Sequence, residues 1–198
     1  MPALAPGFAD PVTSSQTVFR AVMHALARPG TLHLLAPGLT PPTSLGRGMA
    51  AVALALVDYE SPVWLDASLA AVPEVAQWLR FHTGAPLTIH RSEAAFALVT
   101  DAGALPSLDS FALGTAEYPD RSTTLVIEVA RFEGCRSLAL AGPGIAGVQS
   151  FSAGPLPEGF GGALRANRTL FPRGVDLVFV CGDRIAALPR STRVVEGG

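Results

Sequence analysis

The pattern of apolar and polar positions predicts a chain in which helices and strands are mixed. Apolar residues recur at helical spacing over 15–27 and again from Pro73, where a helix is expected to end at Thr83 and Gly84. Residues 46–58 are apolar nearly all round, which is typical of a helix buried on most sides. A weaker helical pattern, interrupted by two glycines, covers 158–170.

Short runs of apolar and β-branched residues predict the strands. Gly182 and Asp183 separate two of these runs and indicate a hairpin, and a two-residue turn is too short for a parallel crossover. The expected fold class is therefore α/β, with a mixed sheet layered with helices, in a single domain spanning 1–198. The predicted strands cover 31–35, 62–65, 96–100, 123–130, 137–141, 175–180 and 185–188, with a further extended segment after Pro86.

Composition changes this picture in one respect, because the surface is poor in charge. Of the 198 residues 49% are hydrophobic and only 15% are charged, against about 25% in an average globular protein. Either the Ala, Gly and Pro surplus is a bias of the source genome, or part of the surface is apolar because a partner covers it. The sequence leaves both explanations open.

Several function classes are excluded or disfavoured. The net charge is −2 and the arginines form no basic stripe, so nucleic acid is not an expected partner. The chain contains no Lys, which excludes a pyridoxal Schiff base and a P-loop lysine. No GxSxG, HExxH or Walker motif is present. We therefore expect no cofactor and no catalytic residues assignable by motif.

Cysteine spacing and the chain ends bear on metal and location. Cys135 and Cys181 have no CxxC spacing and no paired His, so we expect buried free thiols and no metal site. The N-terminus lacks the features of a signal peptide, and the longest apolar run, 49–57, is too short to cross a membrane. The expected location is the cytoplasm.

The strongest candidate for ligand contact lies at the end of the second predicted amphipathic helix. Arg80, His82 and Thr83 could together hold a phosphate or phosphonate. The simpler interpretation, which we favour, is a helix C-terminus whose cationic side chains complement the helix dipole while Gly84 serves as the left-handed cap.

A second candidate is the turn of Gly142, Pro143 and Gly144. Its backbone amides could form an anion-binding nest with a helical turn from Ile145 to Val148 behind it, although a plain strand-ending turn is favoured. The remaining polar groups are interpreted as solvated surface. These are the basic strip of Arg20, His24 and Arg28, the isolated His33 and His90, and the carboxylates of 58–60 and 117–121.

A set of short segments, in fixed order over nearly the whole chain, resembles the PhnH family, which supplies one subunit of the bacterial carbon-phosphorus lyase core complex. No single segment is diagnostic, and the order and spacing make the resemblance specific. The segments are 7–11, 19–20 with 27–30, 62–65, 79–86, 114–116 with Pro119, 142–145, 171–177 and 181–192.

This resemblance implies a protein that joins subunits G, I and J in making ribose 1-methylphosphonate 5-triphosphate from methylphosphonate and ATP. It also implies a homodimer in isolation and a fold like the large domain of pyridoxal-phosphate-dependent transferases, here without the cofactor lysine. The family has no assigned catalytic residues. Fold likeness does not by itself establish chemistry.

Three functional hypotheses follow. The first is a non-catalytic or accessory subunit that completes or positions the active site of the assembly. The second is a stand-alone transferase or hydrolase of phosphate esters that uses Arg80, His82 and Asp176. The third is a homodimeric anion-binding protein without a fixed partner.

Overall fold

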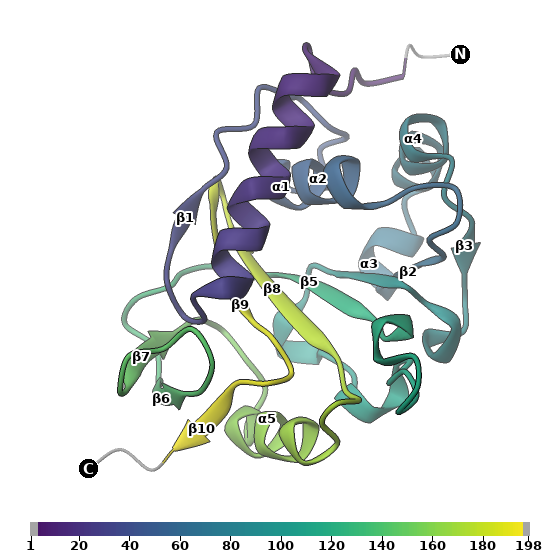
Figure 1. The fold of residues 1–198 in the computed structure, drawn as a ribbon. Helices are drawn as coiled ribbons and strands as arrows, with labels where there is room; N and C mark the ends of the chain where they lie inside the picture. The colour runs from purple at the N-terminus through teal and green to yellow at the C-terminus, as the bar shows by residue number, and fades with distance from the viewer. Residues whose placement is uncertain (1–3, 196–198) are drawn as a thin grey trace.

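A computed structural model describes residues 4–195, and a seven-stranded sheet forms its centre (Figure 1). The strand order is β1-β9-β8-β5-β4-β2-β3. The strands are β1 (His33–Leu34), β2 (Val63–Leu65), β3 (Leu87–Thr88), β4 (Phe96–Val99), β5 (Thr124–Glu128), β8 (Asp176–Cys181) and β9 (Arg184–Leu188).

The direction of the strands confirms a mixed sheet. β3, β2, β4, β5 and β8 run parallel, whereas β9 pairs antiparallel with β8, and β1 pairs antiparallel with β9. The predicted hairpin at Gly182 and Asp183 joins β8 to β9, and Gly182 has a φ of 58°, a left-handed conformation that glycine adopts without strain. The α/β class is thus confirmed.

The predicted helices are present, with one longer than expected. The first begins four residues earlier than the periodicity indicates, because Asp10 caps it by accepting a hydrogen bond from the amide of Thr13 at 3.1 Å and Pro11 fits the first turn. The helices are α1 (Pro11–Ala27), α2 (Arg47–Leu56), α3 (Ala67–Ala70), α4 (Pro73–Thr83) and α5 (Phe160–Thr169), with 3-10 turns at Arg91–Glu93, Ala102–Ala104, Leu108–Ser110 and Pro119–Arg121.

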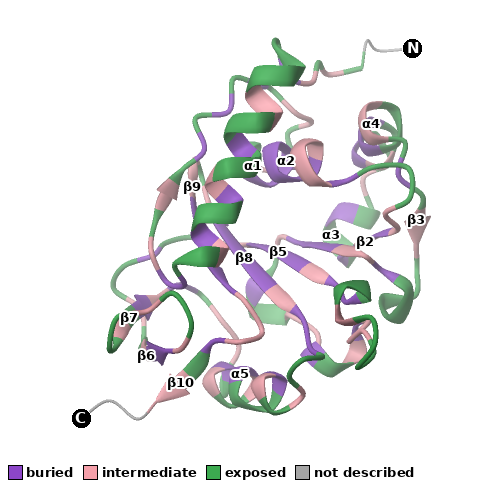
Figure 2. Cartoon of the chain, viewed as in Figure 1, coloured by how far each residue is buried: buried purple, intermediate pink, exposed green. Residues whose placement is uncertain are grey.

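Alternating residues of the large sheet bury its two faces in two separate clusters. In β5, Val126 belongs to the cluster covered by α1 to α4, while Leu125 and Ile127 face α5 and the smaller sheet. Figure 2 shows the resulting pattern, with buried residues along β8 and β5 and an exposed outer face on α1. The central strands are therefore apolar on both sides, as is usual for parallel strands covered by helices.

A second, three-stranded antiparallel sheet has the order β10-β6-β7. Its strands are β6 (Ser137–Ala141), β7 (Gln149–Ser152) and β10 (Arg193–Val195), of which only β6 was predicted. The helical turn expected at Ile145 to Val148 is wrong, because these residues form a bend that leads into β7. The pairing partners of β6 are distant or weakly patterned in sequence, so periodicity could not reveal them.

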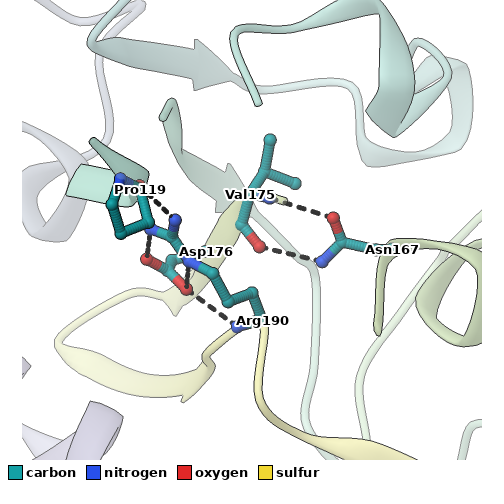
Figure 3. Close-up of polar contacts among 5 residues, drawn as sticks. All are labelled: Pro119, Asn167, Val175, Asp176 and Arg190. Atoms are coloured by element: carbon teal, nitrogen blue, oxygen red, sulfur yellow. Dashed lines mark hydrogen bonds and ion pairs between the residues drawn. The ribbon is translucent and has the colours of Figure 1, made fainter. Parts of the chain in front are cut away.

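A buried polar side chain of α5, that of Asn167, bonds this helix to the backbone just before β8 (Figure 3). The side-chain oxygen of Asn167 accepts a hydrogen bond from the amide of Val175, and its side-chain nitrogen donates to the Val175 carbonyl, both at 2.9 Å. Asn167 is only 6% exposed. This pair of bonds fixes the orientation of α5 before β8 begins.

Close packing of α2 on the β8–β9 hairpin depends on Gly48. A Cβ at this position would overlap the carbonyl oxygen of Gly182 and the side chain of Val180. We predict that Gly48→Ala lowers the free energy of unfolding by about 1–3 kcal/mol, because the buried helix must move. Gly162→Ala in α5 is the control, since a Cβ there meets nothing within 4 Å. Urea denaturation of both variants measures the effect, and equal stability would contradict this account of the packing.

Candidate functional site

The place where an open parallel sheet usually binds a ligand lies between the carboxyl ends of β2 and β4. The chain leaves β2 through α3 and α4 on one face, and leaves β4 through 3-10 turns that pack on the other face. At such a topological switch point the connections diverge and open a crevice outside the strand ends. Functional side chains are therefore expected at this edge of the sheet.

Asp66 follows β2 at this edge and bonds its carboxylate to the backbone there. One carboxylate oxygen accepts a hydrogen bond from the amide of Leu69 at 2.8 Å. The other accepts from the Thr100 amide at 2.7 Å, the Thr100 hydroxyl at 2.8 Å and the Asp101 amide at 3.1 Å. Asp66 is 7% exposed. The donors that an external anion would need at this sheet edge are thus bonded to a residue of the chain.

A second carboxylate, Glu128, lies at the carboxyl end of β5. Burial raises the pKa of Glu128, and repulsion from the charge of Asp66 raises that pKa further. The Glu128 carboxylate lies against Gly46, where a Cβ would overlap it, at the start of α2. The edge of the parallel strands is consequently acidic and disfavours a phosphorylated cofactor.

The sequence analysis did not identify Asp66 and Glu128 as a pair, although a signal was present. Asp66 directly follows the predicted strand 62–65, and Glu128 lies near the end of the predicted strand 123–130. The carboxyl ends of parallel strands meet at one edge of a sheet. Only the strand order, which periodicity does not supply, places the two carboxylates at the same edge.

The predicted candidates Arg80, His82 and Thr83 lie at the C-terminus of α4. His82 Nε2 lies 3.0 Å from the carbonyl oxygen of Ala5, which also accepts a hydrogen bond from the indole of Trp78 at 2.9 Å. The Thr83 hydroxyl donates to the carbonyl of Leu79 at 2.7 Å. Gly84 is the left-handed cap, with a φ of 73°, so the favoured interpretation of a capped helix end is confirmed.

The other predicted ligand residues, Gly142 and Gly144, lie elsewhere. A Cβ on Gly144 would overlap the carbonyl of Ala27, which places this turn against the C-terminus of α1. In Figure 1 the turn beyond β6 is at the lower left and α4 at the upper right. The structure therefore does not bring the two groups of candidates together into one site.

Asp176, invoked for stand-alone catalysis, is bonded to Arg190 (Figure 3). Its carboxylate accepts from the Arg190 backbone amide at 2.8 Å and from the guanidinium of the same residue, which also donates to the carbonyl of Pro119. The side chains of Asp176 and Arg190 are 20% and 13% exposed. This partly buried pair joins β8, the segment after β9 and the 3-10 turn at Pro119–Arg121.

Two expectations about single residues need correction. His33 is not isolated, because its ring centroid lies 6.2 Å from that of His24. Burial lowers the pKa of His33, and the charges of His24 and Arg28 lower it further. Cys135 and Cys181 are free but half-buried rather than buried, since each lies at the margin of the core near the short loops that precede β6 and follow β8.

The other polar groups agree with a surface role. Asp58 accepts hydrogen bonds from Glu60 and Ser61 within one turn, and Arg121 stacks over Tyr118 at 4.3 Å in an exposed loop. Within residues 4–195, no three His, Cys, Asp or Glu side chains gather closely enough to hold a metal ion. Of the helices in the described part of the chain, none has the length and apolar character needed to cross a membrane.

These features define a class: a mixed α/β protein in which a carboxylate of the chain itself, that of Asp66, bonds the backbone donors where β2 and β4 end. The profile of the family described as "Bacterial phosphonate metabolism protein (PhnH)" matches residues 6–195. The chain belongs to this family.

Two relatives agree with this assignment. The "Alpha-D-ribose 1-methylphosphonate 5-triphosphate synthase subunit PhnH" of Rhizobium meliloti (strain 1021) is 45% identical over 187 residues, which are 94% of this chain and 93% of that protein. The "Putative C-P lyase subunit protein HtxG" of Stutzerimonas stutzeri is 37% identical over 82 residues, 41% of this chain and 42% of that protein. The resemblance found in the ordered sequence segments is thereby confirmed.

Because Asp66 bonds both the start of α3 and the backbone after β4, removing one of its acceptor oxygens should destabilise the fold. We predict that Asp66→Asn lowers the free energy of unfolding by about 2–4 kcal/mol, because an amide group then faces buried N–H donors. Asp101→Asn is the matched control, since the single oxygen that caps Gly103 and Ala104 is retained in Asn. Urea denaturation compares the two, and an equal loss in both variants would show that the buried acceptor has no special importance.

Glu128 should make stability depend on pH. The pKa of Glu128 in the folded protein is raised above the ordinary value of 4.5. At pH values above 4.5 the folded state therefore binds more protons than the unfolded state. The free energy of unfolding therefore falls as the pH rises through this window. We predict that Glu128→Gln raises the melting temperature at about pH 8 and that this gain shrinks toward about pH 4. Calorimetric melting beside the exposed control Glu117→Gln measures the difference, and a gain that does not vary with pH would contradict the assignment.

Proposed function

We propose that this chain is an accessory subunit of a carbon-phosphorus lyase core complex and acts with subunits G, I and J in the cytoplasm. The observation that carries the proposal is the 45% identity, over nearly the full length of both chains, to a protein named as a synthase subunit. In this role the chain supports the synthesis of ribose 1-methylphosphonate 5-triphosphate from methylphosphonate and ATP without supplying the catalytic groups itself.

The geometry supports an accessory role over stand-alone catalysis. The polar atoms that a phosphate-ester transferase or hydrolase would need are bonded within the chain, His82 to Ala5 and Asp176 to Arg190. The backbone donors at the strand ends are bonded to Asp66. The mixed sheet covered by helices is also compatible with a transferase-like fold. Because the chain contains no Lys, it could not form a Schiff base with a cofactor.

Exposed apolar side chains support association with other chains, including a homodimer of the free protein. Phe81 is 74% exposed and Tyr59 is 72% exposed. Tyr59 packs beside Gly84, three residues beyond Phe81, so both side chains belong to the surface around the end of α4. Phe19 and Met23 add exposed apolar area one turn apart on α1. Large aromatic residues of this kind are enriched at protein interfaces.

Co-expression tests the proposal directly. The tagged chain, produced with subunits G, I and J from the same source, should elute in one stoichiometric particle by size-exclusion chromatography with light scattering, and should elute as a dimer when produced alone. Tyr59→Ser combined with Phe81→Ser should reduce its recovery in the particle at least several-fold, because interface aromatics contribute strongly to binding. Phe171→Ser, at a side chain 51% exposed beyond α5, is the control.

Separate elution of the wild-type chain under these conditions would overturn the proposed role. Unchanged recovery of the double variant would move the contact to another surface. Thermal melting of the free variants separates loss of binding from loss of folding, because both altered side chains are exposed and should leave the melting temperature nearly unchanged.

A further inference from the structure

Charge is divided unevenly along the chain. Residues 129–195 contain eight Arg against four Asp or Glu, whereas residues 4–128 contain six Arg against eleven Asp or Glu. The basic part includes α5 and all three strands of the small sheet, which lie together in the lower part of Figure 1, on the side of the molecule away from α4. The net charge of −2 is thus the difference between an acidic part and a basic part.

Ion pairing within the molecule increases the basic excess on this side. Three of the four carboxylates in residues 129–195 are paired with arginines. They are Glu133, Asp176 and Asp183, paired with Arg184, Arg190 and Arg47 respectively. The ion pairs within residues 4–195 do not involve the fourth carboxylate, Glu158, or the arginines Arg136, Arg165 and Arg173. Positive charge therefore outweighs negative charge on the surface around α5.

Two of these arginines line a hollow between the small sheet and α5. The hollow has a volume of about 700 Å³, and Arg136 and Arg165 are exposed at its wall. The same two residues line an adjoining hollow of about 400 Å³ beside the start of α5. Arg131 also lines the smaller hollow, but its Nε donates to the sulfur of Cys135 at 3.3 Å. Arg136 and Arg165 are therefore the groups to which a binding partner would present carboxylates.

The larger hollow also has an apolar wall. Val148, which is 64% exposed, lines it together with Leu138 and Val194. A small hydrophilic anion would leave this apolar surface in water. None of the described residues that line the larger hollow is aromatic, so a nucleic acid base would find no side chain on which to stack. Arginine beside exposed apolar side chains is instead typical of a contact with another protein.

A second copy of the chain does not suit this surface in a two-fold dimer. In such a dimer the same surface patch meets itself, so Arg136 and Arg165 would face arginines of the other copy. Like charges placed together across an interface disfavour the contact. The acidic part of a second copy would fit only head to tail, which leads to rings or filaments rather than to a two-fold dimer. The surface therefore fits a different chain.

We propose that the larger hollow docks an acidic segment of another subunit of the assembly. Carboxylates of that segment bond the guanidinium groups of Arg136 and Arg165, which match carboxylates in a two-pronged geometry. Small apolar side chains between the carboxylates pack against Val148. The inference rests on the proposed function for the identity of the partner, and it adds a second contact surface separate from the one around the end of α4.

Charge reversal in the co-expressed assembly tests this surface. Arg136→Glu and Arg165→Glu should each lower recovery of the tagged full-length chain in the particle at least about fivefold at about 0.15 M salt, because a carboxylate then faces a carboxylate. Arg173→Glu is the matched control, since it makes the same change of charge at an exposed arginine that lines neither hollow. Its recovery should stay within about twofold of wild type, because charge interactions across solvent are screened by salt. All three free variants should melt near the wild-type temperature.

A second measurement uses the wild-type chain alone. Phenylglyoxal modifies exposed guanidinium groups, and peptide mass spectrometry reads the extent of modification at each arginine. Modification of Arg136 and Arg165 should be at least several-fold slower in the particle than in the free chain, and that of Arg173 should be unchanged.

The outcomes separate this inference from the proposed function. Co-elution of wild type with unchanged recovery of Arg136→Glu and Arg165→Glu would overturn the docking surface and leave the accessory role standing. Equal modification of these two arginines in the free chain and in the particle would do the same. An equal loss with Arg173→Glu would also overturn the surface, because diffuse charge would then explain the effect. Separate elution of the wild-type chain would overturn both proposals.

Discussion

The structure depends most on the carboxylate of Asp66. This side chain caps α3 through Leu69 and also bonds the backbone where β4 ends, at Thr100 and Asp101. It therefore joins two neighbouring strands at the point where their connections diverge to opposite faces of the sheet. A buried carboxylate is tolerated there because backbone amides and a hydroxyl satisfy its oxygens.

That arrangement has a consequence for electrostatics across the molecule. With Asp66 and Glu128 at the carboxyl edge of the parallel strands, a phosphorylated ligand there would meet two negative side chains. Arg131, Arg136 and Arg165 lie elsewhere, around a hollow beside α5 and the small sheet.

Membership in the PhnH family rests on a match to residues 6–195, and the geometry explains how such a chain can contribute without a catalytic motif. Its polar clusters hold the structure together: His82 ties the N-terminal segment to α4, and Arg190 ties β8 to the 3-10 turn that precedes β5. Apolar side chains such as Phe81 remain exposed.

The sequence by itself determined the local elements and the family. Helical periodicity located α1, α2 and α4, Gly84 marked a helix end, and the Gly182 turn required an antiparallel hairpin, because each depends on neighbouring residues. Only the tertiary structure decided the strand order, the pairing of β7 and β10 with β6, and the placement of Asp66 near Glu128. Those contacts join residues distant in the chain, and they are fixed by the burial of two apolar sheet faces, which depends on the whole fold rather than on local spacing.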